Sequence, residues 1–298
     1  MTSLGQPKDY KVTLADVFNR NSSTYDQTGV FFFTPVGEKL ARLASVKPGD
    51  SVLDVGCGRG ACVFPVAEAV GPSGHVSAID ISTEMIDHLH VEARQRKLGN
   101  VEAQVMDADH PDFATASFDV VLGSFSFVLL SNPLEALARY LPLLRGERKL
   151  AMTAPVFTTG MATWPYGSES MVEVLKQITA NTPDPEATGT ETFADTASLF
   201  SEHENIVAGL DRAGYYDVEI VDDDYELTMD TPQQLVDWTY TQGTRLFWES
   251  HPTERRLELE EALKGEAEAL RDVDGYIKVR APIRYITATG KPVSRDFY

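Results

Sequence analysis

The sequence has little cysteine and no long apolar run, and each shortage excludes a class of protein. The two cysteines, Cys57 and Cys62, lie five residues apart and can form neither a disulfide framework nor a zinc site. We expect both to be buried and reduced, as in a cytoplasmic protein. The N-terminus lacks the apolar core of a signal peptide, and the apolar run over 120–130 is too short to span a bilayer. We therefore expect a soluble, cytoplasmic protein without a membrane partner.

Positive charge is also scarce. The 298 residues include 45 acidic and 26 basic side chains, which gives a formal net charge of −19. Such a surface repels phosphate groups, and no basic stripe offsets the repulsion, so we do not expect a nucleic acid as partner. Apolar residues make up 43% of the chain and charged residues 24%, values that are ordinary for a globular protein.

Short β-rich runs alternate with helical segments between residues 34 and 156. Strands are expected at 51–55, 75–80, 101–106, 118–122 and 149–153. Helices are expected between them, the first beginning at Thr34-Pro35 and the last ending at Gly146. This alternation is typical of an α/β fold in which helices cover both faces of a parallel sheet. Ligands of such sheets bind beyond the carboxyl ends of the strands.

The pattern loosens after residue 156. Helix and strand signals return over 206–229, and a last strand at 276–287 completes a Rossmann-like, mostly parallel sheet of seven strands. Two long inserts interrupt this part, and the second carries helices at 232–248 and 253–271. The organisation that we predict is an N-terminal arm (1–33), a core (34–156), a first insert (157–205), a core continuation (206–229), a second insert (230–272) and a final core strand with the C-terminus (273–298).

The stretch VLDVGCGRGA, residues 52–61, places three glycines directly behind an apolar strand. A glycine-rich turn between a strand and a helix lets backbone N–H groups approach a nucleotide-like ligand. As Gly56-x-Gly58-x-Gly60 the loop is typical of a methyl-donor site. As Gly56-x-Gly58-x-x-Ala61 it is typical of a dinucleotide site. The loop alone fits both ligands.

Three successive strands end in a carboxylate, and this pattern separates the two ligands. Asp80, at the end of the second strand, suits either one, because a carboxylate there accepts hydrogen bonds from ribose hydroxyls. Asp54, just before the glycines, would repel a pyrophosphate but suits an ammonium group and a sulfonium centre. Asp107, after the third strand, is placed to accept a hydrogen bond from an adenine amino group. The set favours S-adenosylmethionine (SAM) over NAD.

The segments VLDVGCGRG, AIDIS, VMDADH and FDVVLGSFSFVLL together resemble the successive motifs of class I SAM-dependent methyltransferases. The nearest subgroup is typified by ubiquinone and menaquinone biosynthesis and by related natural-product enzymes. The resemblance is strong over 34–156 and weaker over 195–228 and 276–292. It implies that the core binds SAM and that the inserts form a helical lid over the strand ends.

The resemblance also implies a role for each matching residue. The glycine loop would hold the methionine part of SAM, Asp80 the ribose, and Ile81 and Asp107 the adenine. Tyr25 resembles an aromatic residue that folds over the cofactor, although it also fits a core position. The implied cofactor-binding residues are Tyr25, Asp54, Gly56, Cys57, Gly58, Gly60, Asp80, Ile81, Asp107, Ala108 and Ser124.

The inserts hold all three tryptophans, and such aromatic segments suit an apolar or aromatic small molecule. The candidate substrate-binding residues are Phe127, Trp164, Tyr166, Trp238, Arg245 and Trp248. His203 is the candidate general base, which oxygen acceptors usually need, whereas amine or carbon acceptors can rely on proximity.

A metal is not expected. Metal-dependent small-molecule methyltransferases of this fold carry an aspartate after the fourth strand, where this chain has Gly123. The three consecutive acids at 222–224 point alternately to opposite faces of a strand and would chelate a metal poorly.

We therefore predict a SAM-dependent methyltransferase that acts on a small, largely apolar or aromatic metabolite, in secondary metabolism and mainly by proximity and orientation. Two alternatives stay open. One is a SAM-binding protein of the same fold that promotes a cyclisation or rearrangement, and the other is an NAD-dependent oxidoreductase, which Asp54 and Asp107 disfavour. A homo-oligomer also stays open, because the arm can dock on its own core or on a second copy.

Overall fold

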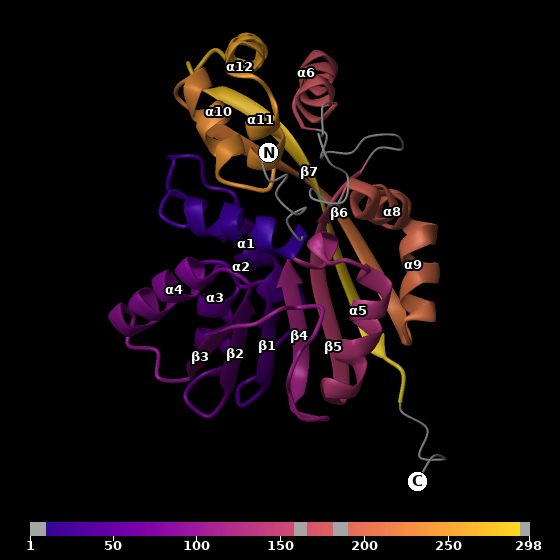
Figure 1. Cartoon of the computed structure of the whole chain (residues 1–298). Coiled ribbons are helices and arrows are strands. Elements are labelled where there is room, and N and C mark those ends of the chain that lie inside the picture. The colour runs from indigo at the N-terminus through magenta and orange to yellow at the C-terminus, as the bar shows by residue number, and fades with distance from the viewer. Residues whose placement is uncertain (1–9, 158–165, 181–189, 293–298) are drawn as a thin grey trace, which may run out of the picture.

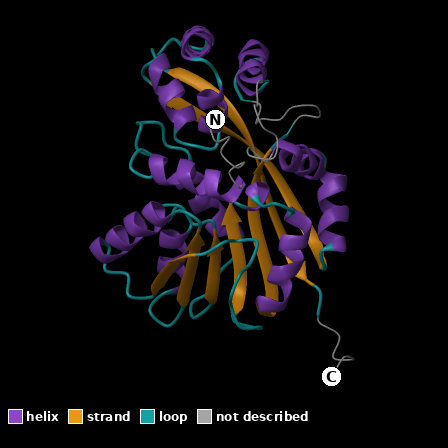
Figure 2. Cartoon of the chain, in the orientation of Figure 1, coloured by secondary structure: helices purple, strands orange, loops and turns teal. Residues whose placement is uncertain are grey.

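The computed structural model describes residues 10–157, 166–180 and 190–292. Its centre is one sheet in the order β3-β2-β1-β4-β5-β7-β6, with helices on both faces (Figures 1 and 2). All strands run parallel except β7, which is antiparallel to β5 and β6. The strands are β1 (Ser51–Val55), β2 (His75–Asp80), β3 (Val101–Val105), β4 (Phe118–Ser124), β5 (Leu144–Pro155), β6 (Tyr215–Met229) and β7 (Ile277–Gly290). The predicted Rossmann-like sheet of seven strands is confirmed.

The helices divide between the two faces of the sheet. Apolar side chains of α2, α3 and α4 pack on one face, and those of α5 and α9 pack on the other. Among the described residues, no helix has the length and apolar character needed to cross a bilayer. The helices are α1 (Tyr10–Asn21), α2 (Phe33–Leu43), α3 (Val63–Val70), α4 (Thr83–Gln95), α5 (Pro133–Tyr140), α6 (Glu169–Thr179), α8 (Thr190–Ser201), α9 (His203–Arg212), α10 (Pro232–Tyr240), α11 (Arg245–Ser250) and α12 (Thr253–Glu268).

Two expectations about where helices begin and end are wrong. The helix expected to begin with Thr34 as its N-cap begins at Phe33 instead, and the carboxylate of Asp26 accepts hydrogen bonds from the N–H groups of Phe32, Phe33 and Thr34. Gly146 does not end a helix. It lies inside β5 with φ +58°, where the pairing with β4 shifts register, and a glycine tolerates this conformation in a bulged strand.

The second insert stands at the far ends of the two longest strands. β6 and β7 extend beyond the carboxyl ends of β1 and β4, and α10, α11 and α12 gather around this extension (Figure 1). The single helix expected at 232–248 is two helices, α10 and α11, separated by a turn over 241–244. The N-terminal arm contains a helix, α1, which lies across the strand ends below this insert (Figure 1). The turn and α1 both border the site.

Candidate active site

A cavity lies beyond the carboxyl ends of β1 to β4. It encloses about 1380 Å³ of space free of protein atoms, its open mouth included. A smaller adjoining cavity shares Tyr25, Gly56, Gly58 and Ser124 with it. Each of the eleven predicted cofactor-binding residues lines one cavity or both. The fold therefore brings together groups that are spread over about one hundred residues of sequence.

The glycine loop has a backbone that side chains would obstruct. Gly56, Gly58 and Gly60 have φ values of +65°, +51° and +99°, a region that L side chains rarely adopt. A Cβ atom on Gly56 would lie 2.4 Å from the Cβ of Ser126. The N–H of Cys57 donates to the carbonyl of Ile79 at 2.9 Å and ties the loop to the end of β2. The loop thus presents bare main chain to the cavity.

Asp80 holds this loop in place. Its Oδ2 accepts a hydrogen bond from the N–H of Gly58 at 2.8 Å, and its Oδ1 accepts one from Ser82 at 2.9 Å. Burial raises the pKa of Asp80, while these backbone hydrogen bonds act in the opposite direction. Asp80 also lines the larger cavity, so one carboxylate can order the loop and still accept hydrogen bonds from a ribose.

Asp54 is a buried acceptor. Its side-chain Oδ2 has no hydrogen-bond partner among the described residues, and Asp54 is only 2% exposed. Burial and, secondarily, the charge of Asp80 raise the pKa of Asp54 well above its usual range. A buried carboxyl without a donor is costly, and a positively charged donor would relieve the cost. The ammonium group of SAM has the chemistry that this position requires.

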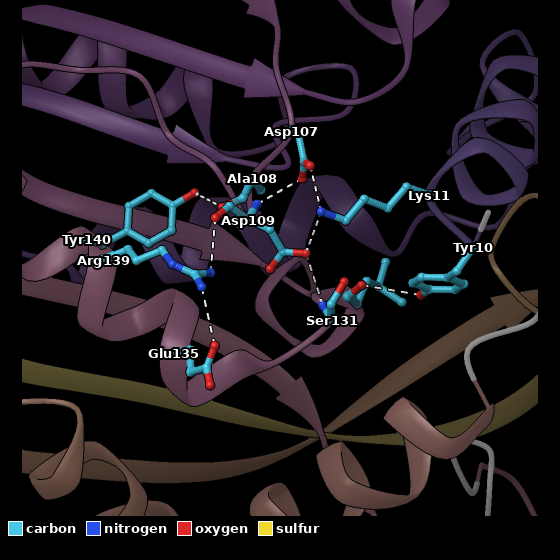
Figure 3. A network of polar contacts seen from close by, with 10 residues as sticks. Tyr10, Lys11, Asp107, Ala108, Asp109, Ser131, Glu135, Arg139 and Tyr140 are labelled. Carbon is cyan, nitrogen blue, oxygen red and sulfur yellow. Dashed lines mark hydrogen bonds and ion pairs between the residues drawn. The ribbon is translucent and has the colours of Figure 1, made fainter. Parts of the chain in front are cut away.

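The carboxylates after β3 are held by a lysine from the N-terminal helix. Lys11 Nζ lies 2.6 Å from Asp107 Oδ2 and 2.8 Å from Asp109 Oδ2 (Figure 3). The N–H of Ser131 donates to Asp109 at 3.2 Å. Burial of Asp109 opposes its ionisation, but the hydrogen bonds from Lys11 and Ser131 outweigh it and lower the pKa. Sequence reasoning missed Lys11, which is 96 residues from Asp107.

Aromatic and aliphatic side chains form the rest of the larger cavity. Tyr25 stacks on Phe33 with ring centroids 4.3 Å apart and lies over Gly58, whose Cβ would be 3.8 Å from the Tyr25 ring. Tyr166 from the first insert lines the cavity as expected. The other apolar lining residues are Leu14, Phe18, Phe125, Val128, Leu129, Leu130, Pro155, Phe157 and Phe247. One space thus combines the acidic strand ends with an apolar wall.

The sequence and the fold both match those of known proteins. Residues 52–146 match a family described as a methyltransferase domain. The chain is 36% identical over 286 residues to nocamycin O-methyltransferase of Saccharothrix syringae. The alignment covers 93% of this chain and 98% of that protein. It is 44% identical over 172 residues to aklanonic acid methyltransferase DauC of Streptomyces sp. strain C5, over 58% of this chain and 77% of that protein.

The chain belongs to the SAM-dependent methyltransferase family. The fold agrees: phosphoethanolamine N-methyltransferase 2 of Haemonchus contortus, solved with S-adenosylhomocysteine, superposes with a TM-score of 0.57 at 17% identity, over 94% of this chain and 60% of that one. The predicted cofactor, SAM, and the predicted enzyme class are thereby confirmed. The oxidoreductase and cyclisation alternatives are not favoured.

Several side chains expected in the substrate site of this methyltransferase lie elsewhere. Phe127, Trp238 and Trp248 are fully buried in the core and are not among the cavity-lining residues described. Phe127 packs edge-on against Tyr140, and the Trp248 indole donates to Thr239 Oγ1 at 2.9 Å. Their large apolar surfaces stabilise the core. Trp164 lies outside the described residues.

Arg245 joins the insert to the N-terminal helix instead of facing the cavity. Its guanidinium donates to Asn21 Oδ1 at 2.6 Å and to Glu249 at 2.7 Å. Glu249 also pairs with Arg20 at 2.6 Å. Helix α1 is therefore held at both ends. Lys11 binds it to the strand ends, and Arg20 and Asn21 bind it to α11.

His203 is not placed to act as the general base. Its side chain is 48% exposed and its Nε2 lies 3.0 Å from Asp222 Oδ2, on the β6 edge of the sheet. Arg284 holds the same carboxylate at 2.6 Å. His203 is not among the described residues that line either cavity. The position of His203 on the β6 edge, outside the lining of both cavities, gives no support to the prediction of a base there.

The acids at 222–224 each have a basic partner. Asp222 pairs with Arg284, Asp223 lies 2.7 Å from Lys39, and Asp224 pairs with Arg280. Within the part of the chain that the structure describes, no three acidic, histidine or cysteine side chains are grouped to hold a metal ion.

Proposed function

We propose that this methyltransferase methylates an oxygen atom of a small, largely apolar metabolite that carries an acidic group. The observation that carries the proposal is the shared cavity, which joins the glycine loop, Asp80 and Asp107 to a wall of aromatic rings. The cavity runs from the glycine loop to the aromatic wall, so a cofactor at the strand ends and an acceptor against the rings can lie side by side. Apolar walls of this kind select an acceptor by burying its hydrocarbon surface.

The names of the relatives support oxygen as the acceptor atom. One is an O-methyltransferase and the other acts on an acid, and the first matches this chain over nearly its full length. We infer that this chain, too, methylates an acidic oxygen atom of its substrate. A carboxylate is already anionic at neutral pH and needs no general base, which agrees with the position of His203 outside the cavity.

When bound, SAM supplies an electrophilic methyl group on a sulfonium centre. Asp54, Asp80 and Asp107 would bind and orient it, and the glycine loop would let it lie close to the main chain. The aromatic wall would exclude water and hold the acceptor beside the cofactor. Orientation of two reactants in this way is worth about 7–11 kcal/mol of the barrier, so positioning alone can supply most of the acceleration.

The test is methyl transfer from SAM labelled in the methyl group to a matched set of acceptors. The set is naphthoate, naphthol and naphthylamine, which share a ring system and differ in the acceptor atom, together with larger apolar carboxylic acids. We expect label in the products of the acids, released by mild alkali as an ester is. Label confined to the amine, or an acceptor converted to an isomer without label, would overturn the proposal.

A further inference from the structure

Gln242 places an unsatisfied donor in the wall of the larger cavity. It lies in the turn between α10 and α11 and is one of the cavity-lining residues. Its side-chain Nε2 is buried and has no hydrogen-bond partner among the described residues. Leaving an amide N–H group buried without an acceptor costs free energy that a bound acceptor recovers. In a native structure such a group calls for an explanation, and a bound ligand is one.

The main chain of Gln242 is fixed from outside the cavity. Its carbonyl oxygen accepts hydrogen bonds from the N–H of Arg245 at 3.0 Å and from Asn21 Nδ2 at 3.4 Å. Asn21 is fully buried, and its Oδ1 accepts from Arg245 at 2.6 Å. Helices α1 and α11 therefore determine where the turn lies. The fold therefore fixes the main-chain position from which the Gln242 side chain extends.

Many apolar side chains line the same cavity as Gln242. Tyr166 and Phe247, from the two inserts, line the same cavity, together with Phe18 and Leu14 of α1. The few polar groups of such a cavity fix the orientation of a ligand and decide which ligands bind. The Gln242 amide nitrogen carries two hydrogens, so the ligand must offer an acceptor oxygen.

We propose that Gln242 determines the specificity of the acceptor site by donating a hydrogen bond to a ketone oxygen of the substrate. The proposal rests on the proposed function, because it takes the ligand of this part of the cavity to be the methyl acceptor. A site with a buried donor rejects a ligand of the same shape that lacks the oxygen, since the donor then stays unpaired.

Calorimetry on the full chain saturated with S-adenosylhomocysteine tests this directly. The probes are the positional isomers of fluorenone carboxylate and of fluorene carboxylate, which have nearly the same shape and differ in one ketone oxygen. We expect the tightest-binding fluorenone isomer to bind at least about 10-fold more tightly than its fluorene counterpart. Equal binding of every matched pair would overturn the proposal.

The variant Gln242→Met keeps the length of the side chain and removes the donor. We expect it to bind both members of the pair alike, and to melt about 1–3 °C higher because no donor is left unpaired. The matched control is Gln233→Met on α10, an exposed residue that bonds Asp237, which should keep the wild-type preference. A ketone preference that survives in Gln242→Met, or a loss of thermal stability like that of a structural residue, would refute the role.

This binding measurement does not depend on methyl transfer. A ketone preference that Gln242→Met abolishes supports the specificity role even where no probe is methylated, and the missing methylation then counts against the proposed function alone. Methylation of the acids without a ketone preference refutes the role of Gln242 and leaves the proposed function intact.

Discussion

Lys11 forms an ion pair with Asp107 at 2.6 Å across 96 residues of sequence, and its ammonium also reaches Asp109. The lysine belongs to α1, and the two carboxylates follow β3, where the adenine of SAM is expected. The far end of α1 is joined to α11 by Arg20. Helix α1 thus connects the cofactor end of the cavity to the insert that carries Gln242.

The first prediction concerns this ion pair. The variant Lys11→Met leaves Asp109 buried with one donor fewer, which should lower the free energy of unfolding by about 1–3 kcal/mol. We also expect the affinity for S-adenosylhomocysteine to fall about 3- to 10-fold, because α1 is held less firmly over the cavity. Denaturant unfolding and calorimetry measure the two effects.

Lys47→Met is the matched control, since Lys47 pairs with Glu147 on the exposed surface. Such a pair contributes about 0–1 kcal/mol, and no change in cofactor affinity is expected. If the two variants behave alike in both assays, Lys11 has no special place in the site.

The second prediction concerns the glycine loop. In Gly56→Ala, the new Cβ would meet Ser126 at 2.4 Å in a backbone with φ +65°. We expect cofactor binding to be lost and the unfolding free energy to fall by about 1–3 kcal/mol. Gly99→Ala, where nothing lies within 4 Å of the new Cβ, should stay within about 0.5 kcal/mol of wild type and bind normally. Normal binding by Gly56→Ala would show that the loop does not approach the cofactor.

The third prediction separates His203 from catalysis. Because His203 pairs with Asp222 on the β6 edge, His203→Ala should keep the rate of methyl transfer within about twofold and lower stability by less than about 1 kcal/mol. Steady-state rates across the pH range provide the measurement. A loss of about 100-fold or more, as expected when a general base is removed, would restore His203 as a candidate.

The fourth prediction follows from Asp54, whose pKa is raised by burial and by the charge of Asp80. Below this raised pKa the carboxyl is protonated in the free protein, while the ammonium group of the cofactor favours the carboxylate. Affinity for S-adenosylhomocysteine should therefore rise as pH rises from the ordinary carboxyl range toward the raised value, and binding should release a proton. Calorimetry in two buffers of different ionisation enthalpy measures that proton.

The raised pKa of Asp54 also makes the stability of the unliganded protein depend on pH. This stability falls as pH rises, whereas the cofactor affinity rises. A carboxyl with a raised pKa in the folded state binds its proton more tightly there than in the unfolded state. The stability that it contributes is present below the unfolded pKa and is lost as pH rises through the folded pKa. Asp54→Asn should remove both this loss and the proton release. Equal proton release in wild type and variant would assign it to another group, such as Asp80.

The central strands were predictable because local signals define them. The strands at 51–55 and 75–80 match β1 and β2 residue for residue, since each is a short apolar run between turns. The three strand-end carboxylates and the glycine loop were predicted to lie together, and they do line adjoining cavities, because parallel strands bring their carboxyl ends to one edge.

The acceptor side of the cavity was much less predictable. The sequence shows that the tryptophans lie in the inserts. It does not distinguish a side chain that packs in the core, such as Trp238, from one that lines a cavity, such as Tyr166. Lys11 and Gln242 were missed because their partners or surroundings come from distant segments. One lysine in a polar arm and one glutamine in a turn carry no local signal.

The most direct test is calorimetric titration of the protein and of Asp80→Ala with S-adenosylhomocysteine. Asp80 joins the glycine loop to the ribose position, so its loss should weaken binding by about 100-fold or more. Asp87→Ala, an exposed residue of α4, is the control and should bind like wild type. Micromolar binding that disappears in Asp80→Ala alone is the expected result. Unchanged binding in Asp80→Ala would contradict the placement of the cofactor at the strand ends.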